Sequence, residues 1–94
     1  MPISRQLMYW LFVSSKGGLN RARMVLALKE KPMNLNKLSE TIGLHYTTIE
    51  HHVKVLVRHG FVVPTGDDYG KAYFLSQDLE DAYGEFERIA QKIR

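Results

Sequence analysis

Four side chains that can form hydrogen bonds lie close together at the start of one predicted helix. They are Tyr46, Thr47, Glu50 and His51. Behind them runs a row of apolar residues with the spacing of one helix face, namely Ile49, Val53, Leu56 and Val57. The polar side chains project away from that row, so they can meet base edges in a DNA major groove. The pattern predicts base contacts at these four positions. Simpler roles remain open, because Tyr46 can pack under a neighbouring hairpin and Glu50 can pair with Lys54.

Five basic residues are placed to contact DNA phosphates. Such contacts hold a protein on DNA but do not distinguish one base sequence from another. The five residues are Arg21, Arg23, Lys54, Arg58 and Lys71. Residues 1–63 contain nine Lys or Arg and three acids, whereas residues 64–94 contain four and seven. Positive charge is therefore concentrated in the part that includes the polar helix, as expected for a nucleic-acid-binding surface. A solvated basic surface without a partner produces the same pattern.

Other kinds of chemistry find little support in the sequence. The chain has no cysteine, and its histidines spread along one helix, where they cannot surround one ion. They are His45, His51, His52 and His59. No phosphate-binding loop, nucleophile elbow or zinc-protease motif occurs. The apolar segment 7–13 is far shorter than the roughly 20 residues that cross a membrane. We expect no enzyme activity, cofactor, metal site or membrane association, and the lack of cysteine fits a cytoplasmic protein.

Capping residues, glycine and proline predict where the elements begin and end. A first helix follows Ser4 to about residue 13, and a second lies between Asn20 and Pro32, with Arg21, Arg23 and Lys29 solvated. Further helices are predicted at 35–42, 46–59 and 77–93, the last capped by Ser76, and strands at 61–63 and 72–75. Gly43 separates two of these helices by a short turn, which is the helix-turn-helix pattern. The strands form a hairpin, or wing, around a loop rich in glycine and aspartate.

These elements predict an α+β winged helix-turn-helix with a two-stranded wing and flanking N- and C-terminal helices, as a single domain over 1–94. Residues 77–94 are expected to form a dimer, because their apolar residues recur at steps of four and three. The predicted interface, including part of the first helix, comprises Leu7, Trp10, Leu11, Leu79, Tyr83, Phe86, Ala90 and Ile93. The alternative is that this face only covers the core of its own domain.

The segment from Gly43 to Phe61, GLHYTTIEHHVKVLVRHGF, resembles the ArsR-like winged helix-turn-helix regulators. The shared features are Gly43-Leu44, Thr47-Thr48, His52-Val53, Val55-Leu56 and Gly60-Phe61-Val62. The flanking segments GGLNRARMVLALKEKP and YGKAYFLS look like an archaeal branch of predicted regulators with this domain. The resemblance spans about residues 17–76 and implies both the fold and DNA binding. It also implies that His52 is structural or faces a phosphate.

Two departures from the ArsR-like pattern affect the prediction. Many of these regulators sense metals through cysteines or through histidines of the last helix, and this chain has neither. Asp67 and Asp68, at the predicted wing tip, are unfavourable for contact with minor-groove phosphates. We therefore expect a sequence-specific, double-stranded DNA-binding transcriptional regulator that acts as a homodimer without metal. The alternatives are a winged-helix module that binds protein instead of DNA, and one domain of a longer regulator.

Overall fold

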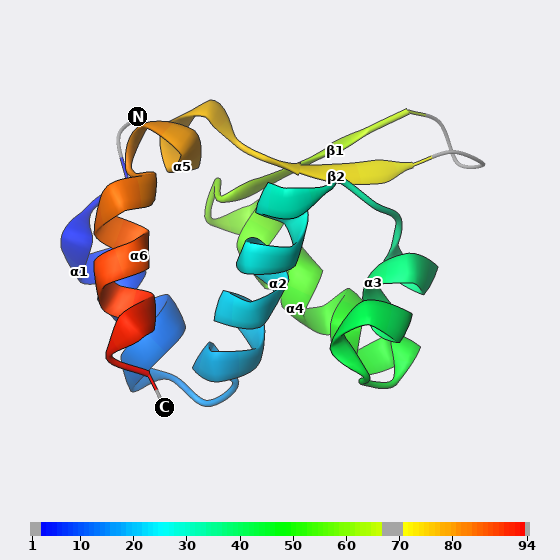
Figure 1. Cartoon of the computed structure of the whole chain (residues 1–94), viewed down its shortest axis with the longest axis horizontal. Coiled ribbons are helices and arrows are strands. Elements are labelled where there is room, and N and C mark those ends of the chain that lie inside the picture. Colours follow the sequence, from blue (N-terminus) through cyan, green and yellow to red (C-terminus); the bar gives the residue numbers. More distant parts are fainter. Residues whose placement is uncertain (1–2, 67–70, 94) are drawn as a thin grey trace.

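The computed structural model describes residues 3–66 and 71–93, and Figure 1 shows a two-stranded hairpin extending along one side of the helices. The N-terminal helix consists of α1 (Arg5–Tyr9) and a π-helical turn, η1 (Trp10–Ser14). The Ser4 hydroxyl accepts a hydrogen bond from the backbone N–H of Leu7 at 3.0 Å, which confirms the predicted cap. The change to π geometry was not predicted.

Helix α2 (Gly18–Glu30) begins earlier than its predicted cap. The residue before its first turn is Gly17, which has φ of 87°, and Asn20 lies inside the helix. A Cβ atom at Gly18 would lie 2.4 Å from the carbonyl oxygen of Phe12, so only glycine permits this approach between η1 and α2. The prediction of Asn20 as the cap was wrong because this tertiary contact, and not the local capping preference, sets the start of the helix.

The helix-turn-helix has the predicted bounds to within a residue. Helix α3 is Leu35–Ile42 and helix α4 is Tyr46–Arg58. The Asn34 side chain accepts from the backbone N–H of Lys37 at 2.8 Å, and Gly43 ends α3 in the left-handed conformation with φ of 81°. These local signals place the two helices without help from the rest of the chain.

The wing is an antiparallel hairpin of β1 (Val62–Thr65) and β2 (Ala72–Leu75). The second strand has its predicted bounds, whereas the first begins after Phe61 and extends two residues further than expected. Phe61 is fully buried under the hairpin. The backbone N–H of Tyr73 also donates to the carbonyl of Met33 at 3.0 Å, which joins the wing to the residues before α3. Asp67 and Asp68 lie outside the described residues.

The C-terminal segment forms two helices instead of one, α5 (Gln77–Asp81) and α6 (Tyr83–Gln91). Ser76 caps the first as predicted, accepting from the backbone N–H of Leu79 at 3.1 Å. The break at Ala82 precedes Gly84, and glycine lowers helix propensity. Figure 1 shows α6 (orange to red) alongside α1 (blue), so the N-terminal and C-terminal helices pack together.

Part of the apolar interface predicted for a dimer belongs to the core of the single chain. Leu11, Leu79 and Phe86 are fully buried, and the Phe86 ring lies 4.9 Å from that of Phe12, centre to centre. Three of the eight predicted interface residues therefore cannot meet a second copy, because their own domain already covers them. Trp10 is 48% exposed, and the other four predicted residues are partly buried against the core. No helix in the described part of the chain is long and apolar enough to span a membrane.

Candidate nucleic-acid interface

One face of α4 presents an exposed row of polar side chains. The members of this row are Thr47, His51, Lys54 and Arg58, at steps of four, three and four residues. The opposite face of the helix is buried by Ile49, Val53 and Leu56. The Thr47 hydroxyl lies 3.0 Å from Nδ1 of His45, which also accepts from the Thr47 N–H at 3.3 Å. The start of the row is thus held by the cap of its own helix, with the Thr47 side chain remaining at the surface.

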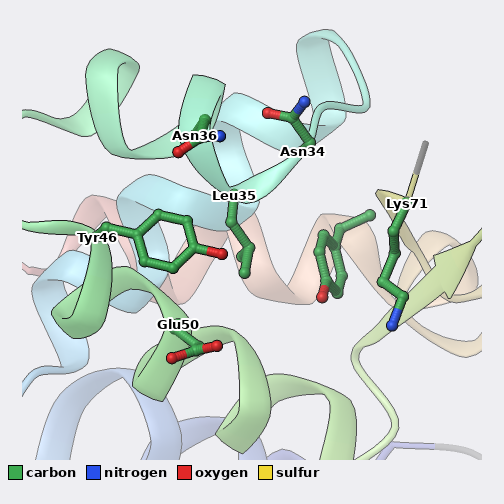
Figure 2. A pocket seen from close by; sticks show the side chains of 7 residues that line it. Asn34, Leu35, Asn36, Tyr46, Glu50 and Lys71 are labelled. Atoms are coloured by element: carbon green, nitrogen blue, oxygen red, sulfur yellow. The ribbon is translucent and has the colours of Figure 1, made fainter. Parts of the chain in front are cut away.

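The other two predicted base contacts face a different direction. Tyr46 and Glu50 line a hollow between α4 and the wing, and Figure 2 shows both side chains at its edge. Glu50 is half-buried, and no ion pair joins it to Lys54 among the residues that the structure describes. Tyr46 lies across the hollow from Lys71 of the wing and remains 39% exposed (Figure 2). The sequence thus grouped four residues that the fold divides into an outer row and a wing-side pair.

The hollow also includes Lys71, a predicted phosphate contact, which comes from the wing. Its remaining lining residues were not predicted as DNA contacts: Tyr73 from the wing, and Asn34, Leu35 and Asn36 from the start of α3. Burial raises the pKa of the Tyr73 hydroxyl, and the neighbouring Tyr46 and Glu50 raise it further. The alternation of exposed and buried faces along β2 was the available signal for Tyr73, because Phe74 faces outwards. In the sequence, the two asparagines beside the start of a helix indicate only helix caps.

Arg23, a predicted phosphate contact, is exposed on α2 but already has partners. Its guanidinium donates to the carbonyl of Ile42 at 2.9 Å and to Asn20 Oδ1 at 3.3 Å. A cation is favourable at this position, because the last carbonyls of a helix form the negative end of its dipole. Arg23 therefore steadies the end of α3 beside the helix-turn-helix turn, and only part of its donor capacity remains for DNA.

Arg21 is buried, which overturns the prediction that it is solvated. Only 4% of its surface is exposed, and Nε donates to the carbonyl of Leu11 at 3.0 Å. Its terminal nitrogens donate to the Lys16 carbonyl at 3.2 Å and to the Ser15 hydroxyl. With these donors occupied inside the protein, Arg21 cannot serve as a phosphate contact. The sequence pattern was misleading because an arginine at the start of a helix is usually at the surface.

His52, on helix α4, is the fourth partner of Arg21, so the contact between them links α2 to α4. Its Nδ1 lies 3.3 Å from Arg21, and only 8% of the residue is exposed. Because the guanidinium can only donate, Nδ1 accepts and the ring is neutral. Burial lowers the pKa of His52, and the charges of Arg21 and His51 lower it further. Of the two roles implied by the resemblance, the structural one fits this burial.

Gly17 allows His52 to approach. A Cβ atom at Gly17 would lie 2.6 Å from Cε1 of the His52 ring, and the residue has φ of 87°. The positive φ and the lack of room for a Cβ atom both favour glycine at this position. The loop between η1 and α2 therefore packs directly on α4.

No group of three or more His, Cys, Asp or Glu side chains in residues 3–66 and 71–93 is arranged to bind a metal ion. The absence of a functional metal site remains a prediction, since it concerns the behaviour of the protein with metal present.

Comparison with known proteins agrees with this geometry. Residues 12–72 match the family model described as the N-terminal domain of the methanogenesis regulatory protein FilR1. The match includes α2, the helix-turn-helix and the first strand of the wing, and it covers well over half of the chain. A search of curated proteins found no match.

Several solved structures share the fold at low sequence identity. A homodimeric winged helix-turn-helix DNA-binding domain, Mb0332 from Mycobacterium bovis, is 12% identical with a TM-score of 0.72, covering 95% of this chain and 81% of that one. It is described as a possible ArsR-family transcriptional regulator. The ST1889 protein from Sulfolobus tokodaii is 26% identical with a TM-score of 0.57, covering 78% of this chain and 76% of that one.

RV1404 from Mycobacterium tuberculosis is 16% identical with a TM-score of 0.65, over 76% of this chain. This chain spans only 51% of the length of RV1404. The match over residues 12–72 establishes that the chain belongs to the family described as the N-terminal domain of the methanogenesis regulatory protein FilR1, and its fold is that of a winged helix-turn-helix.

Proposed function

We propose that this domain regulates transcription in the cytoplasm by binding specific sites in double-stranded DNA as a homodimer. The observation that supports it best is the exposed row of Thr47, His51, Lys54 and Arg58 on α4. An α-helix fits the major groove of B-DNA, where its polar side chains can contact base edges and its cationic side chains can contact phosphates. In this arrangement Thr47 and His51 contact bases, together with Tyr46 and Glu50 from the wing side. Lys54, Arg58, Lys71 and part of Arg23 contact phosphates.

Substitutions along the row should separate anchoring from base recognition. Lys54→Ala and Arg58→Ala should weaken binding to every duplex about equally and reduce the salt slope of log K by about one each, because phosphates are the same in all sequences. Thr47→Ala and His51→Ala should instead change the preference among sites, by about 1–3 kcal/mol per base. The measurement is fluorescence anisotropy on sites selected from a random DNA pool and on a scrambled duplex.

Two outcomes would contradict this function. Equal effects of all four substitutions on every duplex would contradict base recognition by Thr47 and His51. Weak binding to any duplex, even at low salt, would contradict DNA binding itself and favour a protein-interaction module. Lys92→Ala is the matched control for loss of a positive charge, because Lys92 is exposed at the other end of the molecule.

The homodimer is supported by the homodimeric neighbour Mb0332 and by exposed apolar side chains away from the wing. These side chains are Tyr9 (42% exposed), Trp10 (48%) and Val13 (39%) on the N-terminal helix, and Leu19 (48%) and Leu26 (43%) on α2. Exposed apolar side chains of this size are typical of surfaces that meet another protein. We infer that this surface, with the partly buried Leu7, Tyr83, Ala90 and Ile93 at its margin, forms the dimer. Its DNA site would then be a palindrome with half-sites about 34–36 Å apart.

A charge placed in this surface should dissociate the dimer without unfolding the domain. We expect Tyr9→Glu to sediment as a monomer at a concentration where the unaltered protein is a dimer, and to bind a palindromic site at least about tenfold more weakly. Val63→Glu is the control for the sedimentation measurement alone, because Val63 is equally exposed at 43% but lies on the wing, where an added charge would itself weaken DNA binding. An unaltered protein that sediments as a monomer at tens of micromolar would refute the dimer. Deleting residues 77–94 does not test it, since Leu79 and Phe86 belong to the core.

A further inference from the structure

The hollow between α4 and the wing is lined by side chains from three elements that are distant in sequence. The lining residues are Asn34, Leu35, Asn36, Tyr46, Glu50, Lys71 and Tyr73. Figure 2 shows Tyr46 and Glu50 on one side, the asparagines on a second and Lys71 on the third, with Leu35 between them. Its volume is about 290 Å³, just below the range of about 300–1,000 Å³ typical of pockets that enclose a small ligand. An open hollow of this size can hold one unit of a polymer if other parts of the protein bind the neighbouring units.

The walls of the hollow are held in place by backbone interactions. The N–H of Tyr73 donates to the carbonyl of Met33 at 3.0 Å, so the wing cannot move freely away from the start of α3. On the opposite side, Asn34 Oδ1 accepts from the N–H of Lys37 at 2.8 Å. One lone pair of the Asn34 oxygen is thereby used, and the side chain can still offer a ligand its two amide N–H groups. The site is preorganised before any ligand arrives.

The lining provides mainly hydrogen-bond donors. Lys71 carries a positive charge, the two tyrosines carry hydroxyl groups, and the two asparagines carry amide hydrogens. The Tyr73 hydroxyl is a donor at neutral pH, because the ordinary pKa of tyrosine is 10.0 and burial raises that of Tyr73 further. Such donors are the usual partners of phosphate and sugar oxygens in DNA complexes. Glu50 differs from the others, since a carboxylate can only accept and repels a phosphate.

The position of the hollow relative to DNA follows from the function proposed above, on which this inference rests. In B-DNA a sugar–phosphate strand separates the major groove from the minor groove. If α4 lies in the major groove, the hairpin beside it must lie across that strand. The strand then passes between α4 and the wing, directly over the hollow. Glu50, on the α4 side, is nearest to the base edges, and Lys71, on the wing side, is nearest to the backbone.

We propose that this hollow binds one sugar–phosphate unit of the strand between the two grooves, with Lys71 and Tyr73 as phosphate ligands and Glu50 as a specificity filter. Asn34 and Asn36 complete the donor set at the start of α3. Glu50 accepts a hydrogen bond from the amino group of a cytosine, the base that offers N4–H in the major groove. At any other base pair the half-buried carboxylate remains unpaired beside a phosphate, which weakens binding.

If Glu50 is a specificity filter, removing its charge should affect affinity and specificity in opposite directions. Replacing Glu50 by glutamine should strengthen binding to a random-sequence duplex about fivefold, because repulsion of the phosphate is removed. The same change should reduce the preference for the selected site about fivefold or more, because a neutral amide accepts and donates equally well. Asp81→Asn is the control, since it removes one negative charge from an exposed position on α5.

The phosphate ligands are tested on the same duplexes by fluorescence anisotropy at increasing salt. Lys71→Ala should lower the salt slope of log K by about one, whereas Lys92→Ala should leave the slope unchanged. Tyr73→Phe removes only a hydroxyl and should weaken binding to all duplexes by between about twofold and tenfold. Melting temperatures close to that of the unaltered protein show that these surface variants remain folded.

The outcomes separate this inference from the proposed function. If Arg58→Ala weakens DNA binding while Lys71→Ala and Tyr73→Phe do not, the domain binds DNA but the hollow does not hold the strand. If Glu50→Gln weakens binding to random DNA, or changes no preference, Glu50 is not a filter. If the unaltered protein shows no salt-dependent DNA binding, the proposed function fails and this inference fails with it.

Discussion

Replacing Arg21 by methionine is expected to lower the free energy of unfolding by about 2–4 kcal/mol, as measured by urea denaturation. The guanidinium supplies four hydrogen bonds inside the protein, to Leu11, Ser15, Lys16 and His52. Hydrogen bonds of charged groups contribute about 1.5–3 kcal/mol each, and the buried acceptors left unpaired add a further cost. Relief from burying a cation offsets part of this loss. The net effect is large for a domain whose total stability is about 5–15 kcal/mol.

The same substitution should change how stability depends on pH. The pKa of His52 in the folded protein lies below its ordinary value of 6.5, so at lower pH the unfolded chain binds a proton first. Stability should therefore decrease as the pH falls through about 6.5, by at most about 1.4 kcal/mol per pH unit for one histidine. Without the charge of Arg21 the pKa of His52 should rise towards its ordinary value. We expect Arg21→Met to lose less stability than the unaltered protein between neutral and mildly acidic pH.

Arg88→Met is the control for this pair of measurements. Arg88 is 74% exposed in its side chain and pairs with Glu85 at 3.8 Å, a surface interaction worth little. It should change neither the stability nor its pH dependence by more than about 0.5 kcal/mol. If Arg21→Met behaved like Arg88→Met, the buried hydrogen-bond network between α2 and α4 would not contribute to folding.

Phe86→Ala is expected to lower the free energy of unfolding by about 3–5 kcal/mol. Its ring is fully buried and packs edge-on against Phe12 at 4.9 Å, so truncation leaves a cavity between α6 and η1. Phe74→Ala is the control, because Phe74 is 38% exposed on the wing and should cost less than about 1 kcal/mol. Urea denaturation of both variants gives the comparison. A loss below about 1 kcal/mol for Phe86→Ala would show that α6 is not part of the core, and that its apolar face is available to a partner.

The helix-turn-helix could be predicted from the sequence because its signals are local. Asn34 satisfies a free N–H at the start of α3, and Gly43 supplies a conformation that other residues rarely adopt. Each of these capping residues acts within a few residues of the helix end that it specifies. The predicted ranges 35–42 and 46–59 therefore agree with the structure to within one residue.

Only the tertiary structure shows which surface covers the apolar face of the C-terminal segment. The spacing of Leu79 and Phe86 shows that one side of the C-terminal segment is buried, but the spacing is the same whether the cover is a second copy or the same chain. Here the N-terminal helix of the same chain supplies it through Leu11 and Phe12. Burial of Arg21 has the same origin, because its partners belong to η1, the following loop and α4.

The division of the polar residues of α4 also depends on the fold. From the helix alone, Tyr46 and Glu50 are equivalent to Thr47 and His51, since all four project from its polar side. The bond between Tyr73 and Met33 places the wing next to the start of α3 and turns the first pair into the wall of a hollow. The sequence by itself determined the local elements and the chemistry they display. Packing between residues 40 positions apart, which no local pattern encodes, decided which of these side chains converge.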